Sequence, residues 1–435
     1  KMKQLTRLFI PICLETLFYM LSGMVDTLML SAVGDYAVGA VGTANSYIGI
    51  FIIMFSIISS GMVSVMTQNI GAGRPGVAYQ ARQLGLLFNA VAGVLMAVFL
   101  FSGAGAILRM VGIADALYEP ALIYLKIVGG GCILNAVIPI FSSYLRAFGY
   151  TKQPLYATIV GNIANFVMNA VFLFVLHKGV AGVAAATVIS KILNLCIVLY
   201  FSHKLISAKN STERIANKTV LGQIVKVGLP SACETALYNV AMMLVIRFLN
   251  QMDAEGLNVT ARSYTATISN FSYCVGAALA QANAIMTGWH IGAGELEECD
   301  RGTKRAAFVG VCVAVCMETA IVLGSGFIMP LFTDNPEMTA LVRKLLAIDI
   351  VLEIGRVTNL VFGQALKTSG DAVFPAVIAA VFMFVFAVGG TWLFGISMGL
   401  MAVGAYIGLA SDECVRAVGM VWRWKTGKWR TKKLV

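Results

Sequence analysis

The chain has 435 residues, of which 59% are hydrophobic and 12% are charged, and its formal net charge is +11. Soluble globular domains are about half apolar and a quarter charged, so this chain carries too little charge to cover a water-exposed surface. The composition excludes an ordinary soluble protein and indicates a membrane protein whose surplus apolar surface faces lipid. The basic residues are spread over short loops rather than gathered in one patch, so we expect no nucleic-acid partner.

Twelve apolar segments follow one another along the chain. A spanning helix needs about 20 mainly apolar residues, and each segment is long enough. We predict spans at 8–31, 42–69, 84–108, 120–146, 155–176, 179–203, 223–250, 258–289, 305–328, 338–366, 372–395 and 400–423. The predicted fold class is an all-α membrane protein with twelve transmembrane helices.

The second half of the chain repeats the first at an offset near 220 residues. PICLETLFY at 11–19 recurs as PSACETALY at 230–238, and RAFG at 146–149 recurs as KTSG at 367–370. Matches in the same order indicate duplication into two six-helix lobes. Because six is even, the lobes share one orientation and are related by a pseudo-two-fold axis along the membrane normal.

These boundaries predict four parts of the chain. They are an N-lobe at 1–203 with spans one to six, a cytoplasmic linker at 204–222, a C-lobe at 223–424 with spans seven to twelve, and a basic cytoplasmic tail at 425–435.

Lysine and arginine gather in alternate loops. One set of loops includes Lys1, Arg74, Arg146, Lys209, Lys367 and the C-terminal tail. The opposite loops hold Arg109 and Lys178. Because positive residues stay inside, both termini are predicted to be cytoplasmic. We expect a multi-pass monomer in the inner membrane, with the lipid bilayer and a small organic substrate as its partners.

A polar stripe runs along the first span. Glu15, Tyr19, Ser22 and Asp26 are spaced i, i+4, i+7 and i+11, which places them on one helix face. An ionised side chain at the bilayer centre costs at least about 2.5–3.5 kcal/mol, so this face should meet water, an ion or a proton. The alternative is a buried polar seam that only holds helices together.

The fifth span carries Asn162, Asn165 and Asn169 at i, i+3 and i+7, and the sixth carries Thr187. Amide and hydroxyl oxygens with one carboxylate could form a site for a hard cation or a proton. Hydrogen bonding between helices explains the asparagines equally well.

The tenth span carries Asp349, Glu353 and Arg356 at i, i+4 and i+7. Glu353 and Arg356 are predicted neighbours, either as a structural ion pair or as part of a cavity. Glu318 stands alone on the ninth span and receives no role. The chain has no recognisable nucleophile–base pair, metal cluster or phosphate loop, so we expect neither an enzyme nor a metal site nor a cofactor other than a coupling ion.

Several motifs in order resemble the multidrug and toxic compound extrusion (MATE) family over essentially the whole chain. They are Val25-Asp26-Thr27 with Gly34 and Ala40-Val-Gly42, Gly71-Ala-Gly73, Arg146-Ala-Phe-Gly149 before Pro154, Asn165-x-x-x-Asn169, Gly179-Val-Ala-Gly182, Glu353-x-x-Arg356-x-x-Asn359, and Leu366-Lys-x-x-Gly370-Asp371.

The resemblance implies cation-coupled antiport, in which protons or sodium enter while an organic compound leaves. It assigns the N-lobe cation site to Asp26, Asn165, Asn169 and Thr187. The distance from Pro11 to Asp26 matches members in which helix one is proposed to bend on protonation.

Two departures from the family pattern concern the cation sites. Some members carry an aspartate where this chain has Asn169. Others carry an acidic pair on helices seven and ten, where this chain has Tyr238 and Arg356, with Glu234 and Glu353 as the nearest acids.

We expect a substrate cavity lined by Glu15, Tyr19, Glu234, Tyr238, Glu353 and Arg356. Acids and aromatic rings favour lipophilic cations as substrates. The alternative is a flippase for a lipid-linked, anionic or zwitterionic substrate of the same superfamily, since Arg356 is basic. A channel is a further alternative, which the repeat and the buried carboxylates disfavour.

Overall fold

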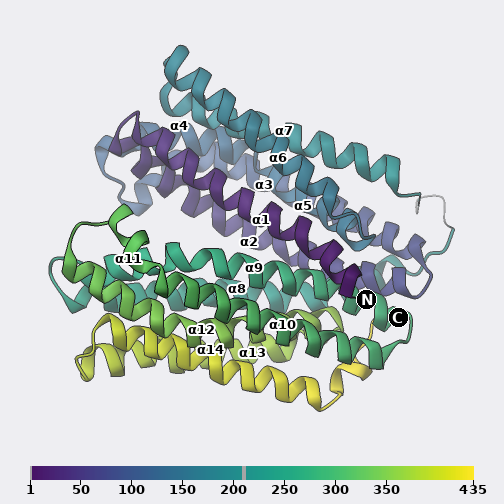
Figure 1. The fold of residues 1–435 in the computed structure, drawn as a ribbon. Coiled ribbons are helices and arrows are strands. Elements are labelled where there is room, and N and C mark those ends of the chain that lie inside the picture. The colour runs from purple at the N-terminus through teal and green to yellow at the C-terminus, as the bar shows by residue number, and fades with distance from the viewer. Residues whose placement is uncertain (1, 208–211) are drawn as a thin grey trace. The chain divides into compact units, whose positions relative to one another are not determined.

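The computed structural model describes residues 2–207 and 212–435 (Figure 1). Lys1, Lys209 and part of the predicted linker lie outside these residues. Throughout the described residues, all regular secondary structure is helical.

The first half of the described chain holds seven α-helices (Figure 1). They are α1 (Met2–Ser31), α2 (Asp35–Gly71), α3 (Pro75–Val111), α4 (Asp115–Gly130), α5 (Cys132–Ala147), α6 (Lys152–Ala170), which continues into the π-helix η1 (Val171–Val175), and α7 (Gly179–Leu205).

The second half continues with helices up to the C-terminus. They are α8 (Asn217–Met252), α9 (Leu257–Gly292), α10 (Leu296–Leu323), α11 (Ser325–Ile328), η3 (Met329–Leu331), α12 (Pro336–Thr368), α13 (Val373–Phe382), η4 (Met383–Val388), η5 (Thr391–Ser397), α14 (Ala402–Lys425) and η6 (Lys428–Thr431).

Each predicted span coincides with one helix or with consecutive helices. The span predicted as one helix at 120–146 is two helices, α4 and α5, bent by 42° at Gly131. Gly129 and Gly130 precede the break, and three successive glycines lower the local preference for a straight helix.

Eight helices of the described chain are long and apolar enough to cross a membrane, and the bent pair would make nine. The spans predicted on α9, α12 and α14 fall outside this set. The reason on α12 and α14 is their charged residues, which include Asp349, Glu353, Asp412 and Arg416. Composition alone therefore does not identify these three helices as spans.

The chain divides into two compact units. The N-terminal unit holds residues 6–229, and the C-terminal unit holds residues 230–435 with residues 1–5. The boundary lies inside α8, next to Pro230. The predicted limits of the lobes, linker and tail stay predictions.

Each unit is a bundle around an apolar core. In the N-terminal unit, α2 packs against α3, α4 and α5, and α6 packs against α7. In the C-terminal unit, α12 is central and packs against α9, α10 and α14. This arrangement places the polar residues of α12 between three other helices.

The residues of the predicted basic tail dock onto the C-terminal unit. Trp429 is almost fully buried, and its ring stacks on Trp424 with 4.1 Å between centroids. Arg430 pairs with Glu297 at 2.7 Å. Burial of the two indole rings holds the end of the chain against α14 and α10.

Glycines allow α14 to approach the preceding helical segment at backbone distance. A methyl group on Gly404 would lie 2.4 Å from backbone atoms of Phe394 and Gly395, and one on Gly408 would lie 2.9 Å from Gly390. The spacing of four residues puts Gly404 and Gly408 on one helix face. Small residues at this spacing let membrane helices pack closely.

Replacement of Gly404 by alanine is expected to destabilise the protein by about 1–3 kcal/mol, the usual cost of overpacking. A lower thermal-unfolding midpoint of the purified protein in detergent would show this. Gly302→Ala on α10 is the matched control, because a methyl group there meets no atom within 4 Å. Equal midpoints for the two variants would contradict the close packing.

Candidate functional site

The carboxylate of Asp26 on α1 accepts hydrogen bonds from two asparagines of α6. Asn165 Nδ2 lies 2.9 Å and 3.1 Å from the two carboxylate oxygens, and Asn169 Nδ2 lies 2.8 Å from Oδ1. The asparagines are four residues apart, so both amides leave the same face of α6. Two of the other three residues predicted for the N-lobe cation site therefore lie within hydrogen-bond distance of Asp26.

The fourth residue, Thr187 on α7, is adjacent and does not bind Asp26 directly. Its hydroxyl donates to the carbonyl oxygen of Val183 at 3.0 Å and lies beside the hydroxyl of Tyr124 on α4. Tyr124 in turn donates to Asn45 Oδ1 on α2 at 3.3 Å. Sequence reasoning missed Tyr124 and Asn45, whose one signal is a polar group inside an apolar span.

The amide oxygens of Asn165 and Asn169 are buried and have no hydrogen-bond partner among the described residues. A buried polar atom left unpaired costs free energy. Rotation of each amide by half a turn would exchange its nitrogen for its oxygen beside the Asp26 carboxylate. The site then offers only oxygen atoms, the ligands that hard cations prefer.

Glu15 on α1 does not stand free in a cavity, because it pairs with Arg146 on α5. Arg146 Nη2 lies 2.6 Å and 2.7 Å from the two carboxylate oxygens, and Thr158 of α6 donates to Oε1 at 3.3 Å. Tyr19, one turn further along α1, is 75% exposed within its unit. The polar stripe of α1 thus has a paired acid near one end and Asp26 near the other.

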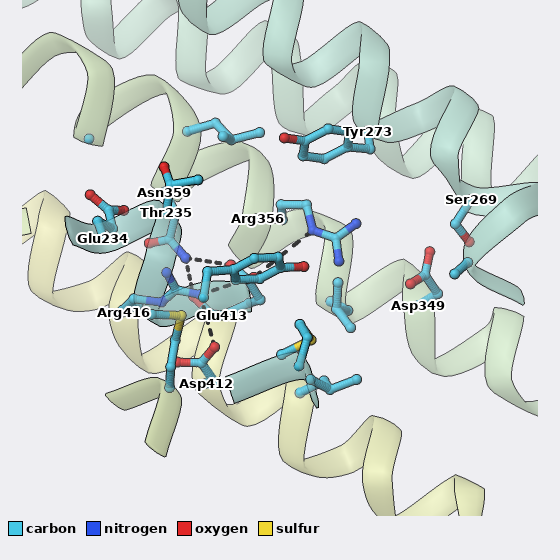
Figure 2. A pocket seen from close by; sticks show the side chains of 18 of the residues that line it. Glu234, Thr235, Ser269, Tyr273, Asp349, Arg356, Asn359, Asp412, Glu413 and Arg416 are labelled. Carbon is cyan, nitrogen blue, oxygen red and sulfur yellow. Dashed lines mark hydrogen bonds and ion pairs between the residues drawn. The ribbon is translucent and has the colours of Figure 1, made fainter. Parts of the chain in front are cut away.

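The C-terminal unit contains a cavity of about 480 Å³ (Figure 2). Its lining includes three of the residues that we expected around a substrate cavity: Glu234 and Tyr238 of α8 and Arg356 of α12. Glu353 is not among the lining residues and pairs with Arg356 at 2.5 Å. The remaining ionisable lining residues are Arg262, Asp349, Lys367, Asp412, Glu413 and Arg416.

The charges of this cavity form a connected network between α12 and α14 (Figure 2). Arg416 contacts Asp412 at 2.9 Å and Glu413 at 3.1 Å. Asn359 donates to the side chain of Glu413 at 2.8 Å, and the guanidinium of Arg356 lies 5.6 Å from the ring centre of Tyr273. Basic and acidic groups are balanced in number, so the cavity presents both signs of charge to a ligand.

The ion pair of Glu15 and Arg146 has a repeat-related counterpart. Glu234 on α8 pairs with Lys367 on α12 at 2.7 Å. Glu234 repeats Glu15, and Lys367 repeats Arg146, in the duplicated motifs of the chain. Each unit therefore contains the same acid–base link between its first long helix and a later one.

A half-buried lysine is a second feature that sequence reasoning missed. Lys191 of α7 donates to Asn135 Oδ1 of α5 at 2.7 Å, a neutral partner. A lone basic residue in the apolar sixth span is the signal that could have drawn attention to it.

A MatE family model matches residues 11–171 and 230–393, which is most of the chain. The chain is a member of the MATE family. MATE proteins are transporters of small molecules rather than enzymes. Membership of this family, together with the long apolar helices, identifies the chain as a multi-pass membrane transporter.

Individual relatives and a solved structure match this chain over nearly its full length. The chain is 32% identical to the uncharacterized transporter YisQ of Bacillus subtilis, over 97% of this chain and 94% of the relative. It is 20% identical to the probable multidrug resistance protein NorM of Thermotoga maritima, over 100% of this chain and 94% of the relative. A MATE crystal structure described as straight has a TM-score of 0.88 at 21% identity and covers 99% of this chain and 97% of its own.

Substitution of Arg146 by glutamine in this MATE transporter removes the partner of Glu15. We expect a loss of about 1–3 kcal/mol in stability, because a largely buried carboxylate then lacks its charged hydrogen-bond donor. Thermal unfolding of the purified protein measures this loss. Glu15→Gln combined with Arg146→Gln should recover most of the loss, and Lys152→Gln at an exposed position is the control. Failure of the double variant to recover would contradict an electrostatic origin.

Proposed function

We propose that this MATE transporter is a cation-coupled antiporter that exports organic, lipophilic cationic compounds by alternating access. The observation that carries the proposal is the Asp26 carboxylate, which receives the amides of Asn165 and Asn169 inside an apolar bundle. Neutral donors supply no countercharge to the ionised carboxylate, whose negative charge is costly in an apolar bundle. A sodium ion or a proton at Asp26 would neutralise that charge.

The proposed architecture has twelve membrane-spanning helices in two six-helix lobes, related by a pseudo-two-fold axis along the membrane normal. The duplicated motifs support it, as do the repeat-related ion pairs of Glu15 with Arg146 and Glu234 with Lys367. The proposed orientation has both termini in the cytoplasm and the protein, as a monomer, in the inner membrane. The distribution of lysine and arginine supports this orientation.

Movement of α1 is the proposed link between cation binding and transport. Pro11 lies inside α1 and has no backbone N–H to continue its hydrogen-bond ladder. Beyond this point, polar side chains of α5 and α6 bind α1 at Glu15 and Asp26. A ligand shifts a conformational equilibrium by its differential affinity for the two states. Neutralisation of Asp26 weakens the bonds from α6 and so favours a different position of α1.

The cavity of the C-terminal unit supports an amphiphilic organic substrate. Tyr238, Tyr273, Met242 and Met383 give it aromatic and adaptable apolar walls. Asp349 lines the same cavity without a basic residue at ion-pair distance among the described residues, and it favours a cation.

A flippase or exporter of a zwitterionic or anionic substrate is the second candidate. Four basic lining residues favour it: Arg262, Arg356, Lys367 and Arg416. Three of them, Arg356, Lys367 and Arg416, already bind acids of the same unit, so we rank this candidate second.

Asp26→Asn is expected to abolish the cation-dependent part of efflux, with a fall of about tenfold or more, which lies within the usual range of coupling between sites. The measurement is efflux from proteoliposomes under separately imposed sodium and pH gradients. The gradient that drives the wild-type protein identifies the coupling ion. Asp35→Asn, at the exposed start of α2, is the control and should transport normally. Full cation-driven efflux by Asp26→Asn would refute the coupling role.

Substrate charge can be tested by competition. A lipophilic phosphonium cation should inhibit transport of a fluorescent cationic dye at lower concentration than a zwitterion or an organic anion of similar size. The physical reason is that desolvated aromatic and acidic groups favour a weakly hydrated cation. Stronger inhibition by the anion would favour the flippase-like candidate.

A further inference from the structure

Three carboxylates of the C-terminal unit converge between α10 and α12. Glu318 of α10 and Asp349 and Glu353 of α12 each place a carboxylate oxygen within 4.8 Å of the other two. Glu318 and Glu353 are fully buried, and Asp349 is 2% exposed. Packing of α10 against α12 brings Glu318 to the pair, which its isolated position in the sequence does not predict.

Two of these three carboxylates, those of Glu318 and Asp349, have no basic residue at ion-pair distance among the described residues. Glu353 pairs with Arg356. Neither carboxylate oxygen of Glu318 has a hydrogen-bond partner in the described chain, and the same holds for Asp349 Oδ2 and Glu353 Oε2. Uncompensated charge in an apolar interior is strongly unfavourable. The cluster therefore has to be neutralised by protons or by a bound cation, because no described basic residue pairs with Glu318.

Two buried serine hydroxyls of α9 lie next to these carboxylates and are a second observation in favour of a ligand. Ser269 is 3% exposed and Ser272 is 1% exposed, and neither Oγ atom has a hydrogen-bond partner among the described residues. Ser269 points toward Asp349, as Figure 2 shows, and Ser272 lies beside Glu318. Buried hydroxyls that face carboxylates can donate hydrogen bonds to them or, through their oxygen atoms, help to bind an ion.

We propose that Glu318, Asp349, Glu353, Ser269 and Ser272 form a binding site for a hard cation, of the size class that includes sodium and calcium. The donors are all oxygen atoms from three helices, which disfavours the soft or borderline transition metals. Carboxylate oxygens this close together can bind one central ion. Side chains from three helices suit sodium or calcium better than magnesium, which demands near-ideal octahedral geometry. Asp349 and Ser269 also line the cavity, which gives the ion a route of entry.

This site goes beyond the proposed coupling role of Asp26. It belongs to the other unit, and it differs from an acidic pair on helices seven and ten, because its ligands come from α9, α10 and α12. A cation there would neutralise the acids beside Arg356 and so release that guanidinium to contact a substrate in the cavity.

The test measures binding of radioactive sodium and, separately, radioactive calcium to the full chain in lipid nanodiscs. Asp26→Asn serves as the background, so that the N-terminal site does not contribute. This background should keep saturable binding of one of the two ions, at one ion per chain. Addition of Glu318→Gln should abolish it, and addition of Ser272→Ala should weaken it by about tenfold, as loss of one supporting group at a metal site does.

A matched control and a folding check make the result decisive. Glu255→Gln, in the exposed turn before α9, should leave binding unchanged. The thermal-unfolding midpoint should rise with the bound ion in the background protein and not in the Glu318→Gln variant, since ligands stabilise only the states they bind. Without the ion, Glu318→Gln should be at least as stable as the background, because it removes a buried charge.

Absence of binding of both ions to the Asp26→Asn protein would overturn the proposal, as would binding that survives Glu318→Gln. Neither outcome depends on whether Asp26 couples transport, because efflux is not the quantity measured.

Discussion

Compensation of buried charge is the constraint on which this structure depends. A helix bundle in lipid offers little water, so each ionisable group inside it needs a partner. Several buried acids meet this need with a basic residue at hydrogen-bond distance, as in the pairs of Glu15 with Arg146, Glu234 with Lys367, and Asp412 with Arg416. These links also tie distant segments of each unit together.

The exceptions to this pairing are the informative residues. Asp26 has two neutral amides as partners, and Glu318 and Asp349 lack a basic partner among the described residues. A carboxylate without a fixed basic partner can bind and release a cation or a proton, and a cation-coupled transporter requires such a group. The proposed cation sites therefore lie at the carboxylates that have no basic partner.

Duplication explains the similarity of the two units, and divergence explains how they differ. Both units keep the acid–base link at the repeated glutamate. The N-terminal unit then places a single carboxylate among amides, whereas the C-terminal unit gathers three carboxylates around α12 and a cavity of mixed charge. Different charge states in the two units would let cation and substrate act at different places in one cycle.

The sequence by itself determined the membrane class, the helical segments and the family, because lipid exposure and helical periodicity are properties of neighbouring residues. It also placed Asp26 with Asn165 and Asn169, since i, i+4 spacing fixes a helix face and the family pattern joins the two faces. Tertiary structure alone decided which side chains meet across helices. Glu15 meets Arg146 across 131 positions, and Glu318 meets Asp349 and Ser272. Such contacts depend on how helices pack and rotate against one another, which no local pattern records.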